Sequence, residues 1–298
     1  MGADDNFSSP QPAPSPSIEW PTLVLAVVIY GGWLMLTACH AMLSWPLLLL
    51  TGGWMVAWQG SLQHEVIHDH PTRYRWINHA IGFMPLSLWL PFAVYAREHA
   101  AHHATPHLTD PFDDTESNYL PGPGGLAHLG AALEATLAGR IVFGPPIRVL
   151  RFWLAELRRA RRDPLAVVRE WGPHLIGVAL IVLWLDRVGL SLWTYGLCFV
   201  WPGTSLLLIR SFAEHRADAD PAARTAVVAD FGPLALLFLH NNLHPWHHDR
   251  PAVPWYRLPA LYRADPHAFA QAPRYAGYRD VIARYLLRPH DRLVHPGR

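Results

Sequence analysis

The chain has 298 residues, of which 51% are hydrophobic and 16% are charged, and its formal net charge is +1. An average soluble domain carries roughly 25% charged residues, so this composition favours a membrane protein over a soluble enzyme. The near-neutral charge argues against nucleic acid as a partner. The two cysteines, Cys39 and Cys198, lie in separate apolar runs and indicate neither a disulfide framework nor a thiolate metal site.

The N-terminal 20 residues differ in composition from everything that follows. They are rich in Pro, Ser and Ala, and such a segment buries too little apolar surface to fold. We therefore predict a disordered tail over residues 1–20 and a single membrane domain over residues 21–298. The tail lacks the basic start of a signal peptide, so the first apolar run is predicted to be retained.

Four charge-free segments are about long enough to cross a hydrocarbon core of ~30 Å as helices. They cover residues 21–38, 45–60, 171–185 and 188–209. The short connections within each pair predict two hairpins. The expected fold class is therefore an all-α membrane protein with four transmembrane helices and a cytosolic helical cap formed by residues 61–170 and 210–298. The alternative is that the same segments are buried helices of a soluble protein.

The 24 basic residues are all arginines, and their distribution predicts the orientation of the chain. Many of them lie between the two hairpins, from Arg140 to Arg169, or follow the last span. Cytoplasmic segments of membrane proteins are enriched in Lys and Arg, so we expect both termini and the cap in the cytoplasm. The cluster from Arg158 to Arg162 is interpreted as a helix side that faces water or lipid headgroups.

Histidines gather in three short motifs near the ends of the predicted spans. The motifs read HEVIHDH, REHAAHH and HPWHH, and a further histidine follows the fourth span directly. Residues three and four positions apart lie on one face of a helix, so each motif directs its histidines to one side. The candidate metal ligands are His64, His68, His99, His102, His103, His215, His244, His247 and His248. His70 is left out because Pro71 disfavours continuation of the helix.

Nine imidazoles on one side of a membrane are enough for two metal ions with four or five ligands each. Neutral imidazole suits first-row metals such as iron and zinc. Residues 64–68 also match the HExxH pattern of zinc proteases, in which the glutamate, here Glu65, is the general base. A membrane zinc protease is therefore an alternative, but it leaves the other two motifs unexplained. A metal transporter is disfavoured because its ligands are expected within the spans near the bilayer centre.

With these motifs the chain resembles the integral-membrane fatty acid desaturase and hydroxylase superfamily, whose pattern is HxxxH, HxxHH and a later HxxHH around two transmembrane hairpins. The resemblance covers residues 21–262 and implies a non-haem di-iron (Fe2+) centre with the nine histidines as ligands, and O2 as co-substrate. The HExxH motif and the acidic segment TPHLTDPFDDTES are similar to the alkane-hydroxylase-like branch. The compact size is similar to that of carotenoid ketolases and small bacterial hydrocarbon oxygenases, so a bacterial inner membrane is expected.

Polar residues beside the proposed ligands are expected to hydrogen-bond to the imidazoles and orient them. These residues are His240, Glu65, Glu98, Glu214, Asn241 and Asn242. His240 is alternatively an additional ligand, and the two asparagines are alternatively a site for water near the metals. Asp110, Asp113 and Asp114 either orient ligands as well or form an ordinary acidic loop. Trp255 and Tyr256 either line the substrate entrance or anchor the chain at the membrane interface.

The resemblance implies oxidation of an unactivated C–H bond in a fatty-acyl or hydrocarbon substrate, which gives a double bond or a hydroxyl group. A carotenoid-type ketolase or hydroxylase and a decarboxylase that forms terminal alkenes are alternatives with the same centre. Two cysteines in apolar runs cannot build an iron–sulfur cluster, so electrons are expected from a separate ferredoxin or rubredoxin and its reductase. The arginine-rich face offers a docking surface for such an acidic carrier.

Overall fold

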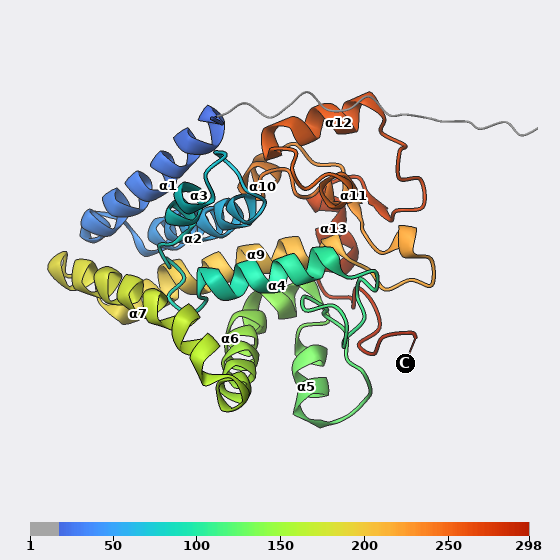
Figure 1. The fold of residues 1–298 in the computed structure, drawn as a ribbon, viewed down its shortest axis with the longest axis horizontal. Coiled ribbons are helices and arrows are strands. Elements are labelled where there is room, and N and C mark those ends of the chain that lie inside the picture. Colours follow the sequence, from blue (N-terminus) through green and yellow to red (C-terminus); the bar gives the residue numbers. More distant parts are fainter. Residues whose placement is uncertain (1–17, 298) are drawn as a thin grey trace, which may run out of the picture.

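Helices dominate the fold, and the computed structural model describes residues 18–297 (Figure 1). The sheet found among these residues has two parallel strands, β1 (Val227–Val228) and β2 (Arg274–Tyr275), with Val227 paired to Arg274. The expectation of an all-α protein is therefore met for nearly all of the described chain.

The described part of the chain includes the last residues of the predicted tail. Residues 1–17 of the predicted disordered tail lie outside the described residues. The last three residues of that prediction are ordered instead, which corrects it: Ile18 forms a bridge with Thr72, and Glu19 is buried. The reason is a buried contact, since His70 Nδ1 donates to Glu19 Oε1 at 2.6 Å and fixes the chain just before the first helix.

The first hairpin consists of α1 (Trp20–Ala38) and α2 (Trp45–Ile67), joined by the short helix η1 (His40–Met42). Each long helix has a proline in its first turn, where the fixed φ of proline and its missing N–H both suit a helix start. α1 matches its predicted bounds closely. α2 continues past the predicted end at residue 60, because nothing in the polar sequence up to Ile67 breaks a helix.

Three helices in the described part of the chain are long and apolar enough to cross a membrane, and they are Trp20–Ala38, Pro164–Arg187 and Leu192–Glu214. The predicted span at 45–60 is not among them. The helix that contains it ends in turns that carry Gln59, Gln63 and His64, which lower its mean hydropathy. The fourth span therefore stays a prediction.

The second hairpin pairs one long helix with a continuous run of three helical segments. These elements are α7 (Pro164–Arg187), α8 (Leu192–Tyr195), the π-helical η2 (Gly196–Val200) and α9 (Trp201–Glu214). Both sides differ from the predicted bounds of 171–185 and 188–209. α7 starts earlier because the Asp163 side chain accepts a hydrogen bond from the N–H of Ala166. The second helix starts later because the connection includes Gly189, whose φ of 74° does not fit a helix.

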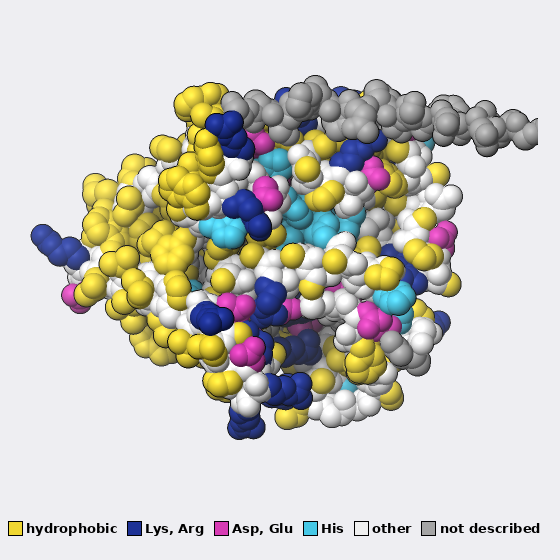
Figure 2. All heavy atoms as spheres, in the orientation of Figure 1, with side chains coloured by type: hydrophobic (Ala, Val, Ile, Leu, Met, Phe, Trp, Pro, Cys, Tyr) yellow, Lys and Arg dark blue, Asp and Glu magenta, His cyan; other side chains and the backbone are white. Residues whose placement is uncertain are grey.

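An apolar surface covers one side of the molecule, over α1 and α7 (Figure 2). Val27 and Met35 of α1 and Ile176 and Leu183 of α7 are between 63% and 73% exposed. Soluble proteins rarely expose contiguous apolar patches larger than a few hundred Å². This exposure contradicts the alternative of buried helices in a soluble protein, and the chain is an integral membrane protein.

The remaining helices lie between and after the two hairpins. They are α3 (Arg75–Gly82), α4 (Phe92–Ala104), α5 (Gly125–Leu133), α6 (Leu137–Arg162), η3 (Pro221–Ala223), α10 (Pro233–Leu237), α11 (His244–Asp249), η4 (Trp255–Arg257), α12 (Leu258–Ala264) and α13 (Tyr278–Tyr285). α4 packs against α2, and β1 packs against both α9 and α11. On α6, the side chains of Arg158, Arg161 and Arg162 are exposed, in agreement with the predicted solvated helix side.

α2 packs closely against η2 and α9 because glycines lie at the crossing. A Cβ added at Gly52 would lie 2.8 Å from the carbonyl oxygen of Cys198. A Cβ added at Gly203 would lie 2.6 Å from Cβ of Val56. Backbone and Cβ atoms cannot move aside as the end of a flexible side chain can, so these glycines set the distance between the two helices.

We predict that Gly52→Ala destabilises the protein by about 1–3 kcal/mol, because the added methyl group overpacks this helix crossing. Thermal unfolding of the detergent-solubilised protein measures the effect. The control is Gly172→Ala on α7, where an added Cβ meets nothing within 4 Å. Equal melting temperatures for the two variants would show that the α2 crossing tolerates a wider separation.

Candidate metal centre

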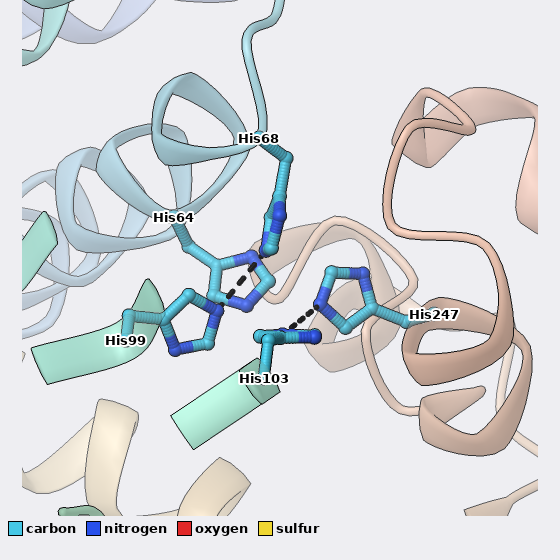
Figure 3. Close-up of side chains that lie close together, drawn as sticks. All are labelled: His64, His68, His99, His103 and His247. Carbon is cyan, nitrogen blue, oxygen red and sulfur yellow. Dashed lines mark hydrogen bonds between the residues drawn. The ribbon is translucent and has the colours of Figure 1, made fainter. Parts of the chain in front are cut away.

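All nine histidines predicted as ligands converge in one region of the fold, in two adjacent groups. Site 1 consists of His64, His68, His99, His103 and His247, and site 2 consists of His102, His215, His244 and His248. Within each group, one ring nitrogen of every residue lies within 4.8 Å of those of the others. Figure 3 shows the site 1 rings meeting from three separate parts of the chain. The sites are neighbours, since the rings of His103 and His248 stack with centroids 4.3 Å apart.

Each HxxHH motif supplies both sites from one short helix. On α4, His99 and His103 are four positions apart and belong to site 1, while His102 between them belongs to site 2. The motif on α11 divides in the same way, with one histidine in site 1 and two in site 2. α11 begins at His244 with Pro245 in its first turn, as predicted. Two short helices thus supply six of the nine imidazoles.

The ends of the long helices supply the other three imidazoles. His64 lies in the last turn of α2, and His68 is the residue that caps this helix. His215 is the capping residue of α9 and forms a bridge with Thr225. Both hairpins therefore end at the histidine groups.

The ring nitrogens that meet in the two sites either contact one another or have no hydrogen-bond partner among the described residues. The Nε2–Nε2 distances are 3.0 Å for His68–His99, 3.2 Å for His103–His247 and 2.8 Å for His215–His244. The buried Nε2 atoms of His64 and His102 have no hydrogen-bond partner among the described residues. Leaving a buried polar atom unsatisfied costs about 1–3 kcal/mol. Imidazole nitrogens that converge on one another, two of them without any hydrogen-bond partner among the described residues, fit first-row metal ions, which would be bound through these nitrogens.

Acceptors behind the rings orient them with Nε2 toward the sites. His99 Nδ1 donates to Glu116 Oε1 at 2.8 Å, and His102 Nδ1 donates to Asp114 Oδ1 at 2.7 Å. In site 2, His244 Nδ1 lies 3.2 Å from the side-chain oxygen of Asn241. A hydrogen bond from Nδ1 to such an acceptor fixes the tautomer and leaves the Nε2 lone pair free for a metal.

The loop that follows α4 holds these two carboxylates in place. Asp114 accepts hydrogen bonds from the backbone N–H groups of Thr109, at 2.7 Å, and Glu116, at 2.9 Å. From the sequence the role of Asp114 stayed open between orienting a ligand and an ordinary acidic loop, and Glu116 was not predicted to hold a histidine. The signal was the run of acidic residues directly after the second motif, but only the path of the loop decides which carboxylate reaches a ring.

Burial keeps most of these imidazoles neutral, as a metal ligand must be. Burial and the neighbouring His99 and His102 lower the pKa of His103 to about 3. Burial and His102 likewise lower the pKa of His215 to about 4. His102 is different: burial lowers its pKa, but the hydrogen bond to Asp114 together with the nearby charges of Glu116, Asp114 and Glu214 raises the pKa above its ordinary value.

Comparison with known proteins agrees with this geometry. The sequence matches the fatty acid desaturase family over residues 41–280, which is most of the chain. The chain belongs to the fatty acid desaturase family. It is also 26% identical over 298 residues to the human protein named sphingolipid delta(4)-desaturase/C4-monooxygenase DES2, covering 90% of this chain and 80% of that protein. The mouse protein of the same name is 26% identical over 297 residues, with the same coverage.

Family membership confirms the resemblance seen in the sequence and makes the chain an oxidoreductase that desaturates or hydroxylates a lipid. The assignment to an alkane-hydroxylase-like branch stays a prediction, since the relatives above are named for sphingolipids. The metal role of the nine histidines also stays a proposal, which is argued below.

Of the six polar residues expected to orient the proposed histidine ligands, Glu214 and Asn241 lie beside site 2. Glu214 Oε1 is 3.8 Å from His244 Nδ1 and accepts a hydrogen bond from Asn241 Nδ2 at 2.9 Å. Glu214 also pairs with Arg210, with Nε and Oε1 3.0 Å apart. Asn241 thus connects a histidine with a carboxylate.

The other four have different contacts. The carboxylate of Glu98 pairs with the partly exposed Arg97, its neighbour on α4. Asn242 donates to the backbone oxygens of Val228 and Asp230 and so holds the loop before α11, and its expected role near the metals stays a prediction.

Glu65 and His240 meet the C-terminal segment instead of the metal ligands. Glu65 Oε2 accepts from the backbone N–H of Trp255 at 3.2 Å, and the ring of His240 stacks on Trp255 with centroids 6.0 Å apart. Trp255 also donates to Thr22 Oγ1 on α1 at 3.1 Å. His240 is in neither histidine group. His70, left out of the ligand set, lies outside both groups as well.

We predict that the metal-free protein loses stability as the pH falls below about 6.5, the ordinary pKa of histidine. His103 and His215 take up protons in the folded state only near their lowered pKa values of about 3 and about 4. Between these values and about 6.5 the unfolded chain binds more protons than the folded chain, so the free energy of unfolding decreases as the pH falls. The raised pKa of His102 acts in the opposite direction, but it is one histidine against two with lowered pKa values. Thermal unfolding from about pH 8 to about pH 4 tests this, and a rising melting temperature on acidification would refute it.

We predict that Glu116→Gln lowers metal affinity about 10–100-fold, because His99 loses the carboxylate that orients its ring. Titration of the metal-loaded protein with a chelator measures this change. Glu98→Gln is the matched control, since this carboxylate sits on the same segment but pairs with Arg97. Equal losses in the two variants would argue against an orienting role for Glu116.

Proposed function

We propose that the chain catalyses the O2-dependent oxidation of an unactivated C–H bond in a fatty-acyl or hydrocarbon substrate, at two irons held by the nine histidines. The observation that carries this proposal is the convergence of nine imidazoles into two adjacent groups. Bound iron would supply the redox chemistry that activates O2. The chain itself would fix the ligands, exclude water and hold the substrate.

The overall reactions balance with an external electron donor. Desaturation converts R–CH2–CH2–R′, O2, two electrons and two protons into R–CH=CH–R′ and two waters. Hydroxylation converts R–H, O2, two electrons and two protons into R–OH and one water. We propose a separate ferredoxin or rubredoxin with its reductase as the donor, docked on the arginine-rich surface.

A mainly apolar cavity of about 260 Å³ between α2, α4 and α9 provides a place for the substrate chain. Val56 and Leu207 line it, and Glu116, which holds His99 of site 1, borders it as well. Thr204 also lines a more open apolar pocket between α6 and α9. An apolar chain bound here would displace water and lie beside site 1. Trp255 and Tyr256, proposed for a substrate entrance, do not line this cavity.

The zinc protease reading of HExxH is less well supported. A protease base needs Glu65 to face a metal-bound water. The carboxylate of Glu65 instead accepts a hydrogen bond from Trp255, and His64 and His68 share site 1 with three further histidines. A sphingolipid-type substrate, suggested by the names of the relatives, a carotenoid and a fatty acid that undergoes decarboxylation remain alternatives for the same centre.

We further propose that α2 provides the fourth membrane span and that both termini and the histidine sites face the cytoplasm of a bacterium. α2 has 23 residues, about 34 Å of helix, which is enough to cross a bilayer. Its polar turns would then emerge on the side where the arginines lie, in agreement with the tendency of basic residues to stay in the cytoplasm.

We predict that the purified protein binds about two irons per chain, and that His102→Ala and His247→Ala each abolish most of this loading. One variant removes a ligand of site 2 and the other a ligand of site 1. His267→Ala is the control, because this histidine is exposed and belongs to neither site. Metal analysis that finds one zinc per chain would support the protease instead.

The reaction is tested by expressing the chain with a ferredoxin and its reductase and profiling the lipids and hydrocarbons of the host. We expect products that have lost two hydrogens or gained one oxygen from labelled O2, and their absence with His102→Ala. Unchanged profiles with an iron-loaded protein and a working electron donor would contradict the proposed function.

A further inference from the structure

Arg210 is a buried charged residue on the wall of the apolar cavity between α2, α4 and α9. It lies on α9 and is 7% exposed. Its Nε is 3.0 Å from Glu214 Oε1, but the N–H does not point at that oxygen. Neither Nε nor Nη1 has a hydrogen-bond partner among the described residues. A buried guanidinium with unsatisfied N–H groups is costly unless a ligand completes them.

The polar end of this cavity lies next to site 1. Gln63, which borders the cavity, directly precedes His64 in the sequence. Tyr95 borders it too, and its ring centroid is 5.8 Å from that of His99. Arg210 lies at this same end, because its guanidinium contacts the side chain of Tyr95 through a hydrogen bond that leaves its Nε and Nη1 without a partner in the described chain. A group bound to Arg210 would therefore be close to the part of the substrate that faces site 1.

The charges around Arg210 indicate which group this is. Glu214 pairs with the guanidinium of Arg210. A second carboxylate, Glu116, lines the same cavity and attracts the guanidinium electrostatically. In the metal-free chain these two carboxylates balance or exceed the charge of Arg210, and Glu134 neutralises Arg148, the other arginine of the cavity. A third anion in an apolar cavity would be repelled and poorly solvated. A neutral oxygen accepts a hydrogen bond without adding charge.

We propose that Arg210 binds a neutral oxygen of the substrate, such as a hydroxyl or an amide carbonyl, and so places an oxygen-bearing group near the carbons that are oxidised. The proposal rests on the proposed function and narrows its substrate class. It favours an amphipathic lipid with a neutral polar group near the reacting carbons over a plain hydrocarbon and over a free fatty acid anion.

Arg148 shows what a satisfied arginine in the same cavity looks like. Its Nε donates to Glu134 Oε1 at 2.7 Å, and its Nη2 donates to the side-chain oxygen of Asn118 at 2.8 Å. These contacts leave it no need for a substrate oxygen. Arg148 is therefore the matched control for Arg210.

The first test measures binding to the full chain, both metal-free and iron-loaded. Three probes share one chain length: an alkane, its carboxylate and a neutral N-acyl amino alcohol. Ligand-induced change in melting temperature reports each affinity. We expect the neutral oxygenated probe to bind at least about tenfold more tightly than the other two. It alone has an oxygen that accepts hydrogen bonds from Arg210 without bringing another negative charge into the cavity. Equal binding of the three probes, or tighter binding of the carboxylate, would overturn the proposal.

The second test uses Arg210→Lys, which keeps the charge beside Glu214 but shortens the reach into the cavity. We expect it to weaken binding of the neutral oxygenated probe about tenfold, with alkane binding and iron content unchanged. Arg148→Lys should leave the preference among the probes intact. Leu207→Trp fills the apolar part of the cavity and should weaken all three probes alike. If Arg210→Lys does not fold, the comparison of probes on the unaltered chain decides alone.

Oxidation of the same probes separates this inference from the proposed function. If the neutral oxygenated probe binds selectively but the iron-loaded chain with its electron donor oxidises none of the three, the proposed function fails and the binding site stands. If all three are oxidised at similar kcat/KM, the function stands and the role of Arg210 fails.

Discussion

The structure depends on keeping nine imidazoles buried, neutral and aimed at shared centres. Burial and neighbouring imidazoles meet the second requirement for most of the rings, because they lower the pKa of rings such as His103 and His215, whereas the pKa of His102 is raised by nearby carboxylates. Burial does not determine how a ring is oriented. Hydrogen-bond acceptors behind the rings orient them. Glu116 accepts from His99 Nδ1 at 2.8 Å, and Asp114 accepts from His102 Nδ1 at 2.7 Å. The loop after α4 therefore matters as much to the metal centre as the helices that carry the histidines.

The geometry of a helix explains why the HxxHH spacing suits two sites instead of one. Positions four apart differ by about 40° around the axis, so His99 and His103 share a face. His102, one position before His103, is turned by about 100° from it and reaches the neighbouring site. A short helix with this motif can therefore border two ions at once, and a second one, α11, closes them from another part of the chain.

The sequence was sufficient for the features that local periodicity controls. The composition predicted the three helices that are long and apolar enough to cross a membrane, and motif spacing predicted all nine histidines that converge, together with the start of α11 at His244. It failed where the partner comes from a distant segment. Glu116 was missed, Glu98 was expected at a ring but pairs with Arg97, and Glu19 was assigned to a tail although it is held by His70. Adjacency along the chain does not tell which way a carboxylate points or which loop returns to meet it.

The pair α2 and α9 connects the membrane part of the molecule with its chemistry. Gly52 fixes the crossing near one end of α2, and His64 lies twelve positions later, about 18 Å along the helix. α9 leads in the same way from Gly203 to His215. Because the cavity lies between these helices, their separation sets both the room for the substrate and the distance between the ligands that they bring to the two sites. Packing among lipid-facing helices and metal geometry are thus a single constraint in this fold.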